Sequence, residues 1–158
     1  MAEISLNSDV TTKMLGDAGE HYALSQFIFA GRACAKMPDC WPQYDLAIVS
    51  GDRLISVSVK TRSETDKWKS GSWFVFDERS VCDWLVFIFK KKDGRVRSWV
   101  IPFEVACENA NTYTSARKDP HNREISWAKL IGDRLKTYED NWVLKYRAEA
   151  APVADEAV

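Results

Sequence analysis

The sequence predicts a mixed α/β domain in which helices flank a central sheet. Its 158 residues are 46% hydrophobic and 28% charged, a composition and length that suit one domain with a substantial core. A helical pattern opens the chain, alternating apolar runs follow, and two turn signals, Gly51-Asp52 and Asp93-Gly94, join those runs into hairpins. The resulting order is α, β, β, β, then β, β, α, α. We expect one domain over residues 1–147 and a disordered, acidic, alanine-rich tail over residues 148–158.

The first helix is predicted from its ends and from its apolar spacing. Cap candidates occupy positions 7–9, apolar residues recur through position 22, and Gly31 stands where a C-terminal glycine is expected. One face of this helix carries Gly16, Gly19, Ala23 and Phe27. Small residues on that face would let the helix backbone approach a sheet closely.

A hairpin over residues 44–60 is predicted next. The run 44–49 is apolar, Gly51-Asp52 forms the turn, and residues 54–60 alternate between apolar and polar. A two-residue turn pairs Ser50 with Arg53 and therefore places Asp45 opposite Ser58. Lys60 then lies on the same strand face as Ser58.

The remaining elements follow from similar local signals. Residues 84–90 form the strongest apolar run, and Asp93-Gly94 turns the chain into its partner strand, which Pro102 ends. In order, we expect strands over 72–76, 84–90 and 96–101, a helix over 103–109, a polar loop over 111–123 and a helical stretch over 127–142.

Composition excludes several classes of function. Twenty-two basic and 23 acidic residues give a net charge of −1, which argues against a surface built entirely for nucleic acid but allows a local basic site. No apolar run approaches the roughly 18 residues of a membrane span, and no secretory signal is present, so a cytoplasmic location without membrane contact is expected. The four cysteines lack metal-binding spacing and are expected to be reduced. The sequence contains no glycine motif that would cradle phosphates, so no organic cofactor is indicated.

One set of residues suits chemistry on phosphodiesters. Glu20, on the small-residue helix, can be brought beside Asp45 and Lys60 at the end of the hairpin. Carboxylate oxygens bind hard divalent cations such as Mg²⁺, which polarise a phosphodiester and acidify an attacking water. A neighbouring lysine can orient or deprotonate that water, or neutralise charge on the phosphate.

Three segments of the chain carry a family resemblance. The stretches 16–20 (GDAGE), 44–48 (YDLAI) and 57–61 (VSVKT) resemble the PD-(D/E)XK nuclease superfamily, in particular small members that include intron-encoded homing endonucleases. The resemblance covers roughly residues 12–101. It implies an αβββαβ core with a mixed central sheet and DNA cleavage that depends on Mg²⁺ or Mn²⁺. It also implies that Glu20 and Asp45 are metal ligands and that Lys60 is the catalytic lysine. Because two active sites are needed to cut two strands, a homodimer is expected.

Ser58 departs from the family pattern. The superfamily usually has Glu, Asp or Gln at this position, two residues before the lysine, and a short neutral hydroxyl is a poor substitute. Three interpretations follow. The metal is held by Glu20, Asp45, a backbone carbonyl and water; or Glu64 supplies another carboxylate; or catalysis has been lost. The last interpretation predicts an inactive nuclease-fold protein that binds nucleic acid or a protein partner. A separate alternative is a small interaction module of the inhibitor or immunity type, with tryptophans at its contact surface.

Two basic segments are candidates for nucleic-acid contact. Arg62, Lys67 and Lys69 follow the lysine motif and are interleaved with Trp68, as in loops that bind nucleic acid. Arg117 and Lys118 form a second basic loop that could contact phosphates. An ordinary solvated loop explains either cluster equally well. DNA is the expected partner, and the choice between DNA and RNA is left open.

Overall fold

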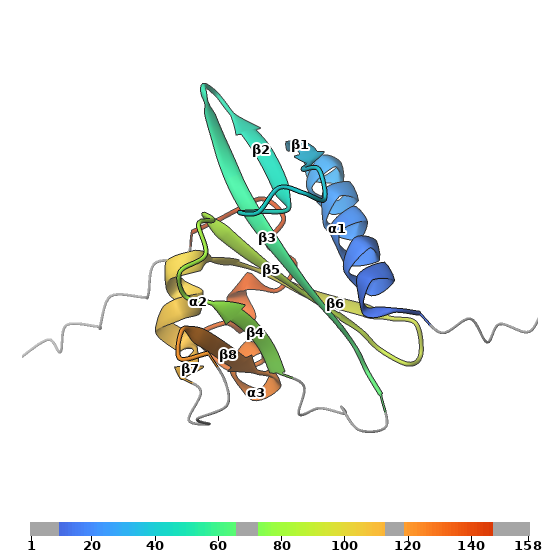
Figure 1. The fold of residues 1–158 in the computed structure, drawn as a ribbon, viewed down its shortest axis with the longest axis vertical. Coiled ribbons are helices and arrows are strands. Elements are labelled where there is room, and N and C mark those ends of the chain that lie inside the picture. The colour runs from blue at the N-terminus through green and yellow to red at the C-terminus, as the bar shows by residue number, and fades with distance from the viewer. Residues whose placement is uncertain (1–9, 66–72, 113–118, 147–158) are drawn as a thin grey trace, which may run out of the picture.

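The chain is described by a computed structural model that covers residues 10–65, 73–112 and 119–146. A five-stranded sheet in the order β1-β2-β3-β5-β6 lies at its centre, beside a three-stranded sheet in the order β4-β8-β7 (Figure 1). The elements are α1 (Thr12–Phe29), β1 (Ala33–Lys36), β2 (Leu46–Ser50), β3 (Arg53–Ser63), β4 (Trp73–Asp77), β5 (Trp84–Lys90), β6 (Val96–Pro102), α2 (Phe103–Asn109), β7 (Asn111–Thr112), β8 (Asn122–Ser126), α3 (Trp127–Leu130) and a 3₁₀ turn, η1 (Lys136–Tyr138).

The central sheet is mixed, as the sequence predicts. β1, β2 and β3 pair antiparallel, β3 and β5 pair parallel, and β5 and β6 pair antiparallel. The β2–β3 hairpin has the predicted register, with Ser50 opposite Arg53, and Gly51 adopts a φ of +62° in the turn. Glycine reaches this conformation without steric penalty, which is why it suits the first position of a tight hairpin turn.

Helix α1 begins at a side-chain cap and ends at a glycine. The Thr11 hydroxyl accepts a hydrogen bond from the Met14 amide, so the cap lies after positions 7–9, which are outside the described residues. At the other end, Gly31 has a φ of +84°, and the Arg32 amide donates to the Phe27 carbonyl. This is the Schellman arrangement, and it confirms the predicted terminating glycine.

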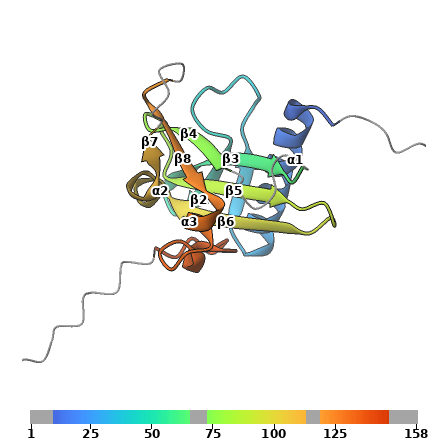
Figure 2. The same cartoon turned by 90° about the horizontal axis from the view of Figure 1, so that it is seen from below.

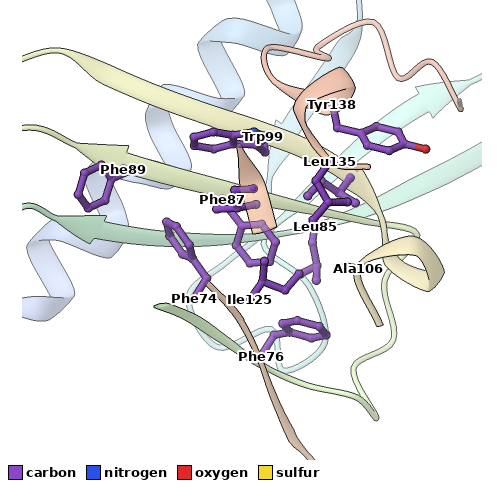
Figure 3. Packing of buried hydrophobic residues seen from close by; sticks show 12 residues of the cluster. Phe74, Phe76, Leu85, Phe87, Phe89, Trp99, Ala106, Ile125, Leu135 and Tyr138 are labelled. Atoms are coloured by element: carbon purple, nitrogen blue, oxygen red, sulfur yellow. The ribbon is translucent and has the colours of Figure 1, made fainter. Parts of the chain in front are cut away.

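The two faces of the central sheet pack against different elements (Figures 1 and 2). On one face, Ala23 and Phe27 of α1 are buried against Val57 and Val59 of β3. On the other face, aromatic side chains from β4, β5 and β6 form a second cluster with Ile125 of β8 (Figure 3). The central strands are therefore covered on both sides, which explains the nearly continuous apolar sequence of β5.

Three predicted features are corrected by the structure. Strand β1 was not predicted, and the expected polar loop over 111–123 contains β7 and the start of β8. The expected helical stretch over 127–142 is also wrong, because α3 ends at Leu130 and the chain continues through short turns. Asp140, at a φ of 53°, lies in the left-handed region and is incompatible with a continuing helix.

The segment that follows η1 closes the α1 side of the domain. Trp142 is 7% exposed, and its ring meets Phe27 edge-on with 5.0 Å between centroids. The neighbouring Asn141 amide donates to the Val100 carbonyl at 3.2 Å and to the Lys145 carbonyl at 2.9 Å. These contacts make the C-terminal turns part of the core. None of the helices in the described ranges has the length and apolarity needed to cross a membrane.

Candidate active site

An open pocket of about 260 Å³ lies between the N-terminal half of α1 and the loop that joins β1 to β2. It is lined by Lys13, Gly16, Asp17, Glu20, Met37, Pro38, Asp39, Trp41, Tyr44 and Asp45. Two of the predicted site residues, Glu20 and Asp45, are thus brought together although they are distant in sequence. The α1 backbone can lie close enough to do this because Gly19 has no side chain at its contact with Thr61 of β3.

Asp45 is held firmly at the start of β2. Its Oδ2 accepts a hydrogen bond from the Val59 amide at 2.7 Å, and its own amide donates to the Val57 carbonyl at 2.9 Å. Its carbonyl accepts from the Met37 amide at 2.8 Å. The carboxylate therefore takes the place of a backbone acceptor at the end of the β2–β3 ladder, which fixes its orientation toward the pocket.

Glu20 reaches the pocket from α1 and is paired with a lysine of β1. Lys36 Nζ lies 3.1 Å from Glu20 Oε2, and each of these side chains is 20% exposed. Burial raises the pKa of Glu20, the hydrogen bond from Lys36 opposes that rise, and the negative charge of Asp45 adds to it. The two carboxylates therefore repel each other across the pocket, and a cation between them would relieve that repulsion.

Lys36 is a pocket-side residue that sequence reasoning missed. Its Nζ also lies 3.0 Å from Asp39 Oδ1, and hydrogen bonds to Asp39 and Glu20 raise the pKa of Lys36 to about 12. Alternate residues of β1 are exposed and half-buried, which turns Lys36 inward. Alternation within four residues was the available signal, but it is too short to distinguish a strand from a loop.

Ser58 and Lys60 lie on the strand face that points away from α1. Ser58 is opposite Leu85 and Lys60 is opposite Phe87, both of which belong to the second core cluster. Ser58 is 7% exposed, and Lys60 is partly exposed and forms no hydrogen bond or ion pair within the described ranges. Burial raises the pKa of the nearby Cys82 to about 11, although a hydrogen bond with Ser58 and the positive charge of Lys60 both act to lower it. Neither Ser58 nor Lys60 lines the pocket that holds Glu20 and Asp45.

Glu64 is positioned away from the pocket. Its Oε2 accepts a hydrogen bond from the Lys92 amide at 2.9 Å, and its own amide donates to the Lys90 carbonyl at 2.8 Å. Both contacts hold it at the far end of β3, beside the β5–β6 turn. The interpretation in which Glu64 supplies another carboxylate to the site is therefore wrong for this arrangement.

The predicted nucleic-acid residues are only partly described. Arg62 is exposed near the end of β3, on the same strand face as Lys60. Lys67, Lys69, Arg117 and Lys118 lie outside the described residues, as does the tail over 148–158.

The donor set fits a cation that needs few protein ligands. The pocket lining contains four acids, Asp17, Glu20, Asp39 and Asp45, and one lysine, Lys13, so it carries a net negative charge. Lys36 is outside the lining and pairs with Glu20 and Asp39. Within residues 10–65, 73–112 and 119–146, no group of three acid, histidine or cysteine side chains is arranged to hold a metal ion. Mg²⁺ is commonly bound by one or two carboxylates, with substrate phosphate and water completing its shell, so Glu20 and Asp45 suit it.

Two solved structures resemble this chain. A bacterial homing endonuclease, I-Ssp6803I, is 20% identical, with a TM-score of 0.53 over 85% of this chain and 90% of that protein. Hjc, a Holliday junction resolvase from the archaeal hyperthermophile Archaeoglobus fulgidus, is 14% identical, with a TM-score of 0.47 over 72% of this chain and 85% of the resolvase. No protein-family model and no curated protein matches the sequence. The likeness to the homing endonuclease shows that the chain shares its fold, a mixed sheet flanked by helices, and this agrees with the fold that the sequence predicted.

Proposed function

We propose that this protein is a Mg²⁺-dependent endonuclease that hydrolyses phosphodiester bonds in DNA. The observation that carries the proposal is the meeting of Glu20 and Asp45 in one pocket, on a fold shared with a homing endonuclease. The motif resemblance indicates the same two carboxylates as metal ligands. Fold alone does not define an activity, so the assignment of nuclease activity depends on this pair.

Glu20 and Asp45 would hold Mg²⁺, or Mn²⁺ in its place, through their carboxylate oxygens. The bound ion would polarise the phosphodiester and lower the pKa of the attacking water. Asp45 is suited to this task because the Val59 amide fixes one of its oxygens. Glu20 would have to exchange its contact with Lys36 for the metal, and Lys36 would then remain paired with Asp39.

Lys60 would assist the attacking water or neutralise charge on the phosphate. It directly follows Val59, the residue whose amide binds Asp45, and its ammonium group has no partner among the residues that the structure describes. A long, unpaired lysine can reach a substrate that spans the open end of the β2–β3 hairpin, the end at which Asp45 lies. Ser58, on the same strand face as Lys60, would contribute only a neutral hydroxyl.

The test is cleavage of supercoiled plasmid DNA with Mg²⁺, together with calorimetric titration of Mn²⁺. We expect Asp45→Asn, Glu20→Gln and Lys60→Met each to slow cleavage by about 100-fold or more. Only the two carboxylate variants should weaken Mn²⁺ binding, because Lys60 is not a ligand. Asp52→Asn, in the exposed hairpin turn, is the matched control and should behave as wild type. Wild-type cleavage rates in Asp45→Asn would contradict the proposal.

A second candidate is a catalytically inactive nuclease-fold protein that binds nucleic acid or a protein partner. It is favoured by Ser58, which is buried where the family usually places a carboxylate, and by the position of Glu64 at the far end of β3. It predicts DNA binding that survives Asp45→Asn, with a salt dependence set by phosphate contacts alone and no cleavage with either metal. A homodimer remains a prediction of the nuclease proposal, and light scattering of the purified protein tests it.

A further inference from the structure

Trp41 occupies an unusual position for a tryptophan. It is 44% exposed and lines the pocket together with Glu20 and Asp45. The tryptophans at 84, 99, 127 and 142 all contribute to the two core clusters. A large apolar ring left open to solvent at the mouth of an acidic pocket gains little for folding, and such rings are common at binding surfaces.

The Trp41 ring is held in place rather than left free to move. The Trp41 amide donates to the Pro38 carbonyl at 2.8 Å, which closes a turn, and Pro42 restricts the backbone of the residue before it. Tyr44 packs against the indole edge-on, with 5.8 Å between centroids and an angle of 67° between the rings. Binding to a ring that is already ordered loses less conformational entropy than binding to a mobile one.

We propose that Trp41 stacks on one unpaired base of the nucleic-acid substrate while the adjoining phosphate occupies the Glu20–Asp45 site. The inference rests on the nuclease function proposed above and names the substrate class for that site: nucleic acid with a base outside the double-helical stack. An indole offers a flat apolar surface for a base in a single strand, bulge or branch point. A base within a duplex has both faces covered by its neighbours and cannot use that surface.

The charge of the pocket favours a base as the partner of Trp41. Its lining contains four acids and one lysine, so a phosphate would be repelled except where a divalent cation bridges it to the carboxylates. A neutral base experiences no such repulsion. The sugar-phosphate backbone would therefore be anchored at the metal, and the base next to it would lie over the indole.

The test compares two short DNA duplexes that differ by one unpaired 2-aminopurine, whose fluorescence falls when it stacks. Binding is measured with Ca²⁺ replacing Mg²⁺ to limit hydrolysis, using wild type, Trp41→Ala, Trp41→Phe and Phe29→Ala. Phe29 is the matched control, because it is an aromatic residue that is 87% exposed and does not line the pocket. Melting temperatures of all four proteins verify that each variant is folded.

We expect wild type to prefer the bulged duplex and to quench the 2-aminopurine. Trp41→Ala should weaken binding to the bulged duplex by about 5- to 100-fold, leave the fully paired duplex unchanged and abolish quenching. The affinity of Trp41→Phe for the bulged duplex should lie between those of wild type and Trp41→Ala, and the affinity of Phe29→Ala should match that of wild type. Equal binding of both duplexes by wild type and Trp41→Ala, with quenching retained, would overturn the role of Trp41.

Plasmid cleavage by the same proteins separates this inference from the proposed function. Wild type that cleaves plasmid but shows no Trp41-dependent preference refutes the stacking role alone. Wild type that neither cleaves nor binds either duplex refutes both.

Discussion

Two glycines on α1 differ in what surrounds them, although they lie on the same part of the helix. A Cβ added to Gly19 would lie 1.7 Å from Thr61 Oγ1 and 2.9 Å from Thr61 Cβ, so rotation of the threonine cannot relieve the clash. A Cβ added to Gly16 would meet no atom within 4 Å. Gly19 is therefore required by the contact between helix and sheet. Gly16 lines the pocket without such a contact, and as a glycine within a helix it weakens α1.

We predict opposite effects for alanine at these positions. Gly16→Ala should raise the free energy of unfolding by about 0.5–1 kcal/mol, because alanine restricts the unfolded chain and favours helix. Gly19→Ala should lower it by about 1–3 kcal/mol through overpacking, and should also weaken metal binding by displacing Glu20. Urea unfolding followed by circular dichroism measures both. Equal stabilisation by the two changes would show that α1 does not contact β3 as described.

The pocket residues that the sequence motifs indicate differ from those that they do not indicate in how local their sequence signals are. Glu20 and Asp45 stand within recognisable motifs on a helix and a strand, so they could be predicted before their positions were known. Lys36 and Trp41 acquire their positions from a short edge strand and a turn between two prolines. Neither has a sequence period that indicates which way a side chain points.

At the scale of elements, the end of β4 is fixed by an ion pair that responds to pH. Arg79 donates to both carboxylate oxygens of Asp77, at 3.0 and 2.7 Å, and also contacts Asp119 at 3.2 Å. Hydrogen bonds from Arg79 lower the pKa of Asp77 to about 2. Because the folded state favours the ionised carboxylate, this pair stabilises the protein above the ordinary pKa of 3.8, and the stabilisation is lost as the pH falls toward 2.

Arg79→Met should therefore destabilise the protein at neutral pH and have little effect at about pH 2. The loss should be modest, since the Asp77 side chain is 34% exposed and water screens the pair. Urea unfolding across this pH range, with an NMR titration of Asp77, measures the change. Arg53→Met is the control, because Arg53 is exposed and forms no ion pair within the described part of the chain. An Arg79→Met effect that is constant with pH would contradict the assignment.

The elements that could be predicted are those whose burial is encoded locally. Strand β5 and helix α2 have the predicted bounds, because a continuous apolar run and a preceding proline define them. Strand β8 (NREIS) contains one apolar residue, Ile125, and its existence depends on pairing with Phe74 in β4. From α3 onward, buried residues at 130, 135, 138 and 142 resemble helical spacing, but they come from the end of α3 and the short turns that follow it.

For the whole molecule, the charge balance would limit the DNA binding that the proposed function requires. The chain has a net charge of −1, and the pocket lining is acidic, so general attraction for a polyanion is weak. In the proposed function a cation would join the phosphate to the carboxylates, so we predict that DNA affinity falls by about tenfold or more when EDTA replaces Ca²⁺. Fluorescence anisotropy with a labelled oligonucleotide measures this. Asp45→Asn should bind equally with and without Ca²⁺, and a wild type that does the same would contradict a metal-mediated contact.

All the side chains that line the pocket come from residues 13–45, which form α1, the edge strand β1 and the loop before β2. The core around β3, β5 and β6 is built almost entirely from later residues. Edge elements of this kind open more readily than central strands, so amide hydrogens of β1 should exchange with solvent well before those of β5. The face that carries the pocket would then fluctuate as its own cooperative unit while the rest of the sheet stays closed. A ligand that bridges α1 and the start of β2 would slow amide exchange in β1 more than amide exchange in β5.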